Sequence, residues 1–125
     1  MRFALLCFTL LALPALAETP RDQLTRFEAE ARVAANATRG AQFFSVRHGR
    51  EWSCTSCHTE KPLTKGRHAV TGKMIKPLAP AANAERFADA ARTEKWFRRN
   101  CNDVLGRECS AGEKADVLAF LIAQK

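Results

Sequence analysis

The first clear pattern of apolar and polar positions lies between about residues 21 and 44. Four apolar side chains in this segment recur at helical spacing and fall on one face of a helix: Leu24, Phe27, Ala31 and Ala34. Asn36 and Thr38 interrupt the pattern, and both residue types are less favourable in helix interiors than at helix ends. We therefore predict a helical segment that is divided at these two residues.

A second helix is predicted near the C-terminus, and its start can be read from the sequence. Ser110-Ala111-Gly112-Glu113 has the form of a capping box, with Ser110 as the N-cap and Glu113 at the third helical position. The residues that follow form a broad apolar face: Val117, Leu118, Phe120, Leu121 and Ile122. Such a face is suited to packing against the N-terminal helix.

The pattern between these two helices is weaker. A helix is expected from about Asp89 to Asn100, with Asp89 as its cap and three residues directed inward: Ala90, Trp96 and Phe97. A shorter helical turn is expected from Asn83 to Phe87. The stretch from Thr59 to Pro80 is expected to be a loop, because it has little periodicity and several Gly and Pro residues. The predicted elements together indicate an all-α domain.

The N-terminal segment is typical of a secretory signal peptide. Arg2 precedes a short apolar run, and Ala15-Leu16-Ala17 is a small-x-small cleavage site. The run is too short for a permanent membrane helix, and no second apolar segment of spanning length follows it. We expect cleavage after Ala17, which removes residues 1–17 and leaves one domain, residues 18–125, in the periplasm without a permanent membrane anchor.

The candidate chemistry centres on the pentapeptide Cys54-Thr55-Ser56-Cys57-His58, the attachment signature of a c-type haem. Two thiols separated by two residues can each add to a vinyl group of one porphyrin, and the adjoining histidine then reaches the iron. Redox dithiols and zinc sites also use Cys-x-x-Cys. The chain lacks the strand-helix-strand pattern of the former and the second ligand pair of the latter. We predict one covalent haem c on Cys54 and Cys57, with His58 as an axial ligand.

Charge alone leaves the type of binding partner open. The chain has 20 Lys and Arg residues against 13 Asp and Glu residues, a formal net charge of +7. Such a balance is compatible with nucleic-acid binding, but no nucleic-acid motif is present, and export together with a haem site favours an acidic redox partner.

The remaining cysteines are expected to form a disulfide. Cys7 leaves with the signal peptide and the haem uses two others, so only Cys101 and Cys109 remain. In an oxidising compartment these two should pair, and the short stretch between them contains the turn-permitting Gly106. Two free thiols are the alternative.

The residue pattern does not decide which group lies opposite His58 on the iron. An electron carrier commonly uses a methionine sulfur, and Met74 is the one methionine left after cleavage. His68 would give a bis-histidine haem, whereas His48 precedes the motif by too little chain to cross the macrocycle comfortably. With Met74 or His68 bound in both redox states, the protein would be a plain electron-transfer cytochrome. A peroxidase-like enzyme would need His68 as its distal acid–base group.

A longer pattern runs from Cys54 to the C-terminus and bears on this choice. Its most specific part is Trp96-Phe97-Arg98-Arg99-Asn100-Cys101, followed by the second cysteine, Cys109. Here the chain resembles the sphaeroides haem protein family of class I monohaem cytochromes c. The resemblance implies that Asn100 is an axial ligand through its side-chain oxygen, with a disulfide between Cys101 and Cys109 beside it.

The resemblance also implies a fold and a function. In small cytochromes c a glycine of the N-terminal helix lets the C-terminal helix cross closely, with an aromatic residue beside it, and Gly40 and Phe44 match these positions. A dihaem cytochrome c, fed by a membrane cytochrome b, is implied as the electron donor. Oxygen binding or nitric oxide conversion is implied as the activity, which would make the protein a haem oxidoreductase.

The chemistry of an amide ligand agrees with a gas-binding role. An amide oxygen is a hard, weak-field donor that holds ferric iron but has little affinity for the softer ferrous state. Reduction is therefore expected to release Asn100 and to open the distal face of the haem to oxygen, nitric oxide or carbon monoxide.

Overall fold

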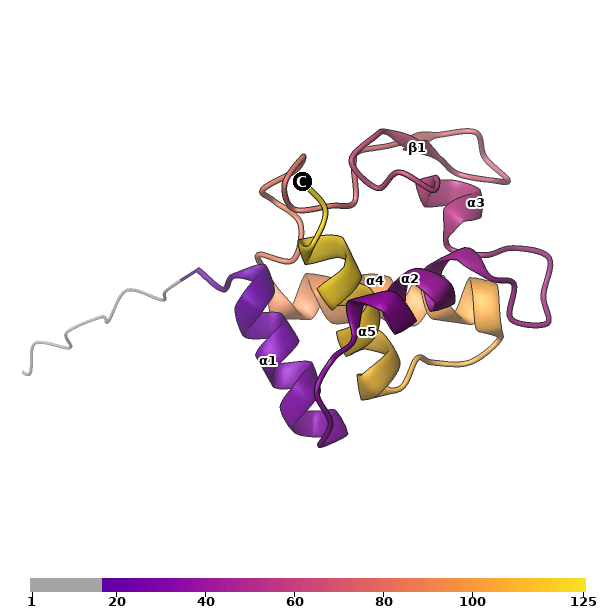
Figure 1. Ribbon diagram of the computed structural model, residues 1–125. Coiled ribbons are helices and arrows are strands. Elements are labelled where there is room, and N and C mark those ends of the chain that lie inside the picture. The colour runs from indigo at the N-terminus through magenta and orange to yellow at the C-terminus, as the bar shows by residue number, and fades with distance from the viewer. Residues whose placement is uncertain (1–16) are drawn as a thin grey trace, which may run out of the picture.

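The computed structural model describes residues 17–125, which form five helices and one small hairpin (Figure 1). In chain order the elements are α1 (Pro20–Ala31), α2 (Ala37–Ser45), α3 (Thr55–His58), β1 (Gly66–Arg67), β2 (Met74–Ile75), α4 (Ala90–Leu105) and α5 (Ala111–Ile122). The predicted signal peptide lies outside the described residues, except for Ala17. Over the described range, none of the helices has the length and apolar character needed to cross a membrane.

α1 and α2 arise from the segment that the sequence predicts as one divided helix. Thr19 caps α1 in a capping box with Asp22. The helix ends at Arg32, whose φ of 55° is left-handed. α2 begins after Asn36, whose side-chain oxygen accepts the backbone N–H of Arg39 at 2.9 Å. The predicted division is confirmed at Asn36, where its cause is a helix cap. The prediction is wrong for Thr38, which lies within α2, and for Ala34, which is exposed between the two helices and not on a helix face.

α5 lies at the centre of the apolar core. Its predicted capping box is present, because the Ser110 hydroxyl accepts the Glu113 N–H and the Glu113 carboxylate accepts the Ser110 N–H. Both α1 and α2 pack against α5 (Figure 1). The buried core residues of the α1 side are Leu24, Phe27, Ala115 and Leu118, and those of the α2 side are Phe44, Val117 and Leu121.

The contact between α2 and α5 is a close crossing at Gly40. A Cβ atom built on Gly40 would collide with the backbone carbonyl group of Asp116. Phe44, one turn further along α2, is fully buried beside this crossing. The predicted roles of Gly40 and Phe44 are therefore confirmed.

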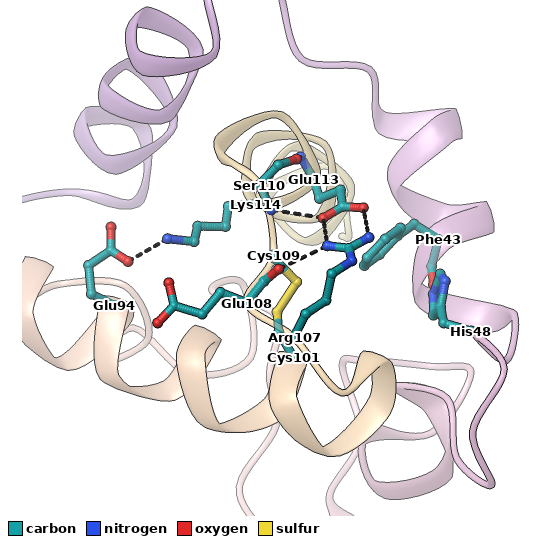
Figure 2. The surroundings of a disulfide bond; sticks show 10 residues. All are labelled: Phe43, His48, Glu94, Cys101, Arg107, Glu108, Cys109, Ser110, Glu113 and Lys114. Carbon is teal, nitrogen blue, oxygen red and sulfur yellow. Dashed lines mark hydrogen bonds and ion pairs between the residues drawn. A yellow bond between two sulfur atoms is a disulfide. The ribbon is translucent and has the colours of Figure 1, made fainter.

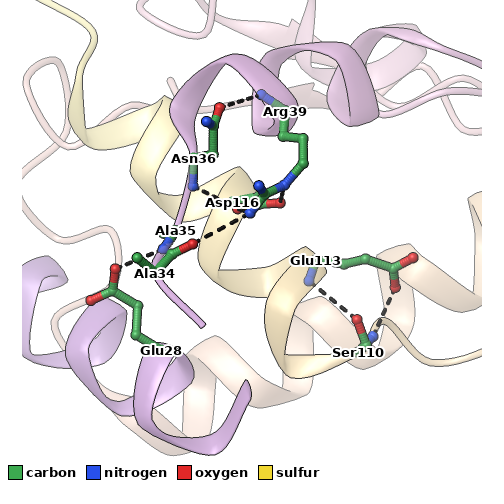
Figure 3. A network of polar contacts seen from close by, with 8 residues as sticks. All are labelled: Glu28, Ala34, Ala35, Asn36, Arg39, Ser110, Glu113 and Asp116. Carbon is green, nitrogen blue, oxygen red and sulfur yellow. Dashed lines mark hydrogen bonds and ion pairs between the residues drawn. The ribbon is translucent and has the colours of Figure 1, made fainter. Parts of the chain in front are cut away.

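Asp116 of α5 fastens the link between α1 and α2 (Figure 3). The residue is only 8% exposed. Its carboxylate accepts a hydrogen bond from the Asn36 N–H at 2.7 Å. It also accepts hydrogen bonds from Nε and Nη2 of Arg39 at 2.6 and 2.7 Å. Because both carboxylate oxygens receive hydrogen bonds, the buried negative charge is compensated.

Replacing Asp116 by alanine is expected to lower the free energy of unfolding by about 2 to 4 kcal/mol. The substitution leaves the Asn36 N–H and the Arg39 guanidinium without their shared acceptor. Guanidinium unfolding of the haem-loaded protein, followed by far-UV circular dichroism, measures the change. As a control, Lys76→Ala removes an exposed pair with Glu85 and should cost less than about 1 kcal/mol. Equal losses in the two variants would contradict this role of Asp116.

α4 starts as predicted but is longer than predicted. It follows the cap residue Asp89, whose carboxylate accepts a backbone N–H of the first turn at 2.6 Å. The helix does not end at Asn100 and continues for more than one turn. The reason is burial, because Cys101 and Val104 extend the inner face of the helix into the core.

A carboxylate on α4 joins this helix to two others. Glu94 accepts hydrogen bonds from Arg26 of α1 at 3.0 Å and from Lys114 of α5 at 2.7 Å. Both cations also lie over the ring of Phe27, at 4.6 and 5.4 Å from its centroid. α4 is thereby held against the α1–α5 pair.

The helical turn predicted from Asn83 to Phe87 is present as a single turn, and it does not extend into a helix. The Arg86 N–H donates to the Asn83 carbonyl at 3.0 Å, as in a single turn. Phe87 then adopts a left-handed φ of 59°, which ends any helical path. This conformation places Phe87 against Phe97 and the core.

The hairpin lies within the stretch predicted as a loop. β1 and β2 pair antiparallel, with Gly66 opposite Ile75. A Cβ atom on Gly66 would collide with the carbonyl oxygen of Cys57, so the hairpin backbone packs directly on α3. Strands of two residues carry too little alternation to be recognised from sequence.

Candidate haem site

The three residues of the attachment motif lie on one helical turn. The N–H groups of Cys57 and His58 donate to the carbonyl of Cys54 at 3.3 and 3.0 Å. Residues three apart on such a turn share a side, which places both thiols together. The turn begins at the buried Ser53, whose N–H donates to the Ser56 hydroxyl at 3.0 Å.

Cys54, Cys57 and His58 line a cavity of about 720 Å³. Its walls come from α2, α3, the hairpin, the segment 76–89, α4 and α5. Much of the lining is apolar: Phe44, Leu78, Phe87, Phe97, Val117 and Leu121. This size and lining suit a porphyrin ring. Within residues 17–125, no three His, Cys, Asp or Glu side chains gather as a metal site, so the zinc alternative has no support. The residues present therefore fit a haem c.

The ionisation of the motif also suits haem attachment. Burial, with a smaller contribution from the neighbouring Cys57, raises the pKa of the Cys54 thiol to about 11. Burial lowers the pKa of His58 to about 4, with a smaller contribution from the positive charge of Arg86. At neutral pH Cys54 is a protonated thiol, unlike the low-pKa thiolate of a redox dithiol. His58 is a neutral imidazole with a lone pair available to a metal.

Asn100 lines the same cavity from α4. The adjacent Cys101 is joined to Cys109 by a disulfide, with Cα atoms 5.6 Å apart (Figure 2). The loop between the two cysteines is held independently, because Arg107 donates to both carboxylate oxygens of Glu113 at 2.9 and 2.8 Å. The backbone next to Asn100 is thus attached to the start of α5.

His68 lines the cavity from the hairpin, but its ring already accepts hydrogen bonds from the hairpin backbone. Its Nδ1 accepts the backbone N–H groups of Val70 and Thr71 at 3.3 and 3.2 Å. In the neutral ring the proton then resides on Nε2, the nitrogen that would have to be free to bind iron. Ligation through His68 would require these two hydrogen bonds to break.

Met74 and His48 are placed differently from Asn100. Met74 lines the cavity but is 57% exposed, and its hairpin packs on α3, the element that carries His58. His48 lies apart from the lining, with its Nε2 2.8 Å from the carbonyl oxygen of Phe43. Asn100 is therefore the candidate that projects from a wall separate from the attachment helix.

Two further residues line the cavity without a predicted role at the haem. Trp96, predicted to point inward, is 43% exposed and lines the cavity, with the Arg99 guanidinium 5.0 Å from its ring centroid. Arg86 lines the cavity from the turn before α4 and is half-buried. Its residue type alone indicates no role in the cavity, because arginine is ordinarily a surface residue.

Comparison with known proteins places the chain among cytochromes. Residues 30–121 match the family model described as a domain of unknown function, DUF1924. The chain is 48% identical to the cytochrome c-type protein SHP of Cereibacter sphaeroides, and the match covers 98% of each protein. It is 46% identical to cytochrome c'' of Methylophilus methylotrophus over 65% of this chain and 56% of that protein.

Solved structures give the same result. The structure of oxidised SHP, described as an oxygen-binding cytochrome c, superposes with a TM-score of 0.81 at 45% identity, covering 86% of this chain and 99% of that one. Oxidised cytochrome c'' from Methylophilus methylotrophus superposes with a TM-score of 0.78 at 36% identity, covering 85% and 94%. A solution structure of cytochrome c'', concerned with haem-ligand detachment, superposes with a TM-score of 0.74 at 36% identity, covering 84% and 93%.

Proposed function

Since the chain belongs to the family of monohaem cytochromes c that includes the cytochrome c-type protein SHP, we propose that it binds small diatomic molecules at its ferrous haem c. In this proposal Asn100 is a weak sixth ligand that is bound in the ferric state and released on reduction. The oxygen binding ascribed to the SHP structure supports the proposal.

When bound, the haem would supply an iron that can be ferric or ferrous. His58 would hold this iron in both states, since its buried imidazole is neutral at neutral pH. Asn100 would offer a hard oxygen donor, which favours ferric over ferrous iron. The apolar lining of the cavity limits competition from water once Asn100 has moved.

The observation that carries the proposal is the position of Asn100. It lines the motif cavity from α4, whereas its rivals Met74 and His68 come from the hairpin that packs on the His58 helix. His68 is engaged by two backbone N–H groups, and Met74 is largely exposed.

The proposal extends to the cellular setting. We infer export to the periplasm with cleavage after Ala17, and reduction by a dihaem cytochrome c that is itself fed by a membrane cytochrome b. Cleavage removes Arg2 and lowers the formal net charge from +7 to +6, which still favours an acidic partner. Conversion of oxygen or nitric oxide is the proposed oxidoreductase activity.

An optical spectrum of the purified protein tests the proposed gas site. The spectrum is recorded for the oxidised form, after dithionite, and after addition of carbon monoxide to the reduced form. We expect a high-spin ferrous spectrum that changes at once with carbon monoxide. A low-spin ferrous spectrum that does not change on addition of carbon monoxide would mean a permanent ligand such as Met74 or His68. The protein would then be an electron carrier.

A further inference from the structure

Arg86 is held in a fixed orientation at the wall of the haem cavity. Its Nε donates to the carbonyl of Pro77 at 3.0 Å and its Nη2 donates to the carbonyl of Lys76 at 2.8 Å. Asn83 donates to the same Pro77 carbonyl at 3.3 Å and so steadies the same loop. These contacts fix the guanidinium plane and leave further N–H groups of Arg86 unused by them.

The charge of Arg86 is only partly solvated. The guanidinium is half-buried, and this burial lowers the pKa of Arg86. Neighbouring Glu85 offers partial compensation, but the carboxylate of Glu85 is paired with Lys76 at 3.5 Å and is 75% exposed. A cation that is half-buried beside an apolar cavity is stabilised by an anion bound within that cavity.

A haem c brings two carboxylates, its propionates, into the cavity. A guanidinium presents parallel N–H donors that match a carboxylate. We propose that Arg86 binds a haem propionate and, by neutralising it next to the iron, raises the reduction potential of the haem. This inference goes beyond the proposed gas binding, because it depends only on the presence of haem c.

The direction of the effect follows from electrostatics. The ferric haem carries one more positive charge than the ferrous haem, so a nearby cation favours the ferrous state and an unpaired propionate favours the ferric state. Removing Arg86 takes away the cation and exposes the propionate charge. Both changes act in the same direction, toward a lower reduction potential.

Spectroelectrochemical titration of the haem-loaded protein tests the proposal. In Arg86→Gln the equilibrium constant for reduction should fall on the order of tenfold, which corresponds to about 59 mV for one electron. Arg86→Lys keeps the charge but loses the paired donors, and it should recover part of the difference.

Two control variants separate the effect of Arg86 from those of a nearby surface charge and of a loosened loop. Lys76→Gln removes a neighbouring but exposed cation, and Asn83→Ala loosens the same loop without a charge change. Each should alter the equilibrium constant by less than about twofold, since exposed charges are screened by solvent.

Resonance Raman spectra supply an independent readout. The propionate bending band should shift in Arg86→Gln and stay in place in both control variants. An unshifted band, or a potential that falls as far in Asn83→Ala as in Arg86→Gln, would overturn the proposal. The carbon monoxide response of the native protein does not depend on this result, so the two proposals can fail separately.

Discussion

Replacing Asn100 by alanine is expected to keep the haem covalently attached while changing the ferric spectrum to that of an iron without its protein sixth ligand. Cyanide added to the ferric protein should bind at least about tenfold more tightly, because it no longer competes with an amide that occupies the site most of the time. The ferrous protein should respond to carbon monoxide as the native protein does, since Asn100 has already left the iron. Equilibrium cyanide titration and optical spectra in both redox states measure these effects.

The controls for this experiment are Met74→Ala and His68→Gln. Both residues line the same cavity, but neither is expected to contribute a ligand, so the ferric spectrum and the cyanide affinity should remain as in the native protein. A changed ferric spectrum in Met74→Ala, together with a native spectrum in Asn100→Ala, would assign the sixth position to the sulfur and refute the amide ligand.

Gly40→Ala is expected to cause the largest loss of stability, about 3 kcal/mol or more. The added Cβ meets the backbone carbonyl of Asp116, which cannot turn aside as a flexible side chain could. The helices α2 and α5 must then separate, and this opens the packing of Phe44 against Val117 and Leu121. The better helix propensity of alanine offsets only about 1 kcal/mol of this loss.

The matched control is Gly112→Ala in the first turn of α5. An added Cβ there comes no closer than 3.8 Å to its nearest neighbour, the Cβ of Ala31. Denaturant unfolding should therefore find this variant unchanged or more stable by up to about 1 kcal/mol. If both glycine variants lost similar stability, the close crossing at Gly40 would not be the cause.

Those parts of the fold that depend on local sequence signals are predicted well. Three helices are capped by a side chain that bonds a backbone group three residues away: those after Asn36, Asp89 and Ser110. Contacts between residues so close in the chain can be predicted from the sequence alone. The end of α4 is missed because the polar residues after Asn100 have modest helix propensity. Burial of Cys101 and Val104 by distant parts of the chain overrides that preference.

In the haem site, too, residues placed by local contacts are predicted and residues placed by distant parts of the chain are not. Cys54, Cys57 and His58 are found from spacing, because one helical turn brings them together. Asn100 has no such signal, since only the packing of α4 brings it to the cavity, and residue types alone leave Met74 and His68 as rivals. The role of Arg86 is missed for a similar reason, because its half-burial and its hydrogen bonds to two loop carbonyls arise only when the chain folds.

If Asn100 is the sixth ligand, as proposed, the disulfide beside it bears on how fast it can leave the iron. Because Cys101 is bonded to the loop that precedes α5, the α4 backbone has little freedom to withdraw from the cavity. In the proposed mechanism, exchange at the iron then needs only rotation about the side-chain bonds of Asn100. Such rotations take picoseconds to nanoseconds, whereas helix displacements take microseconds or longer. Gas uptake after reduction would accordingly be limited by entry of the molecule into the cavity and not by rearrangement of the protein.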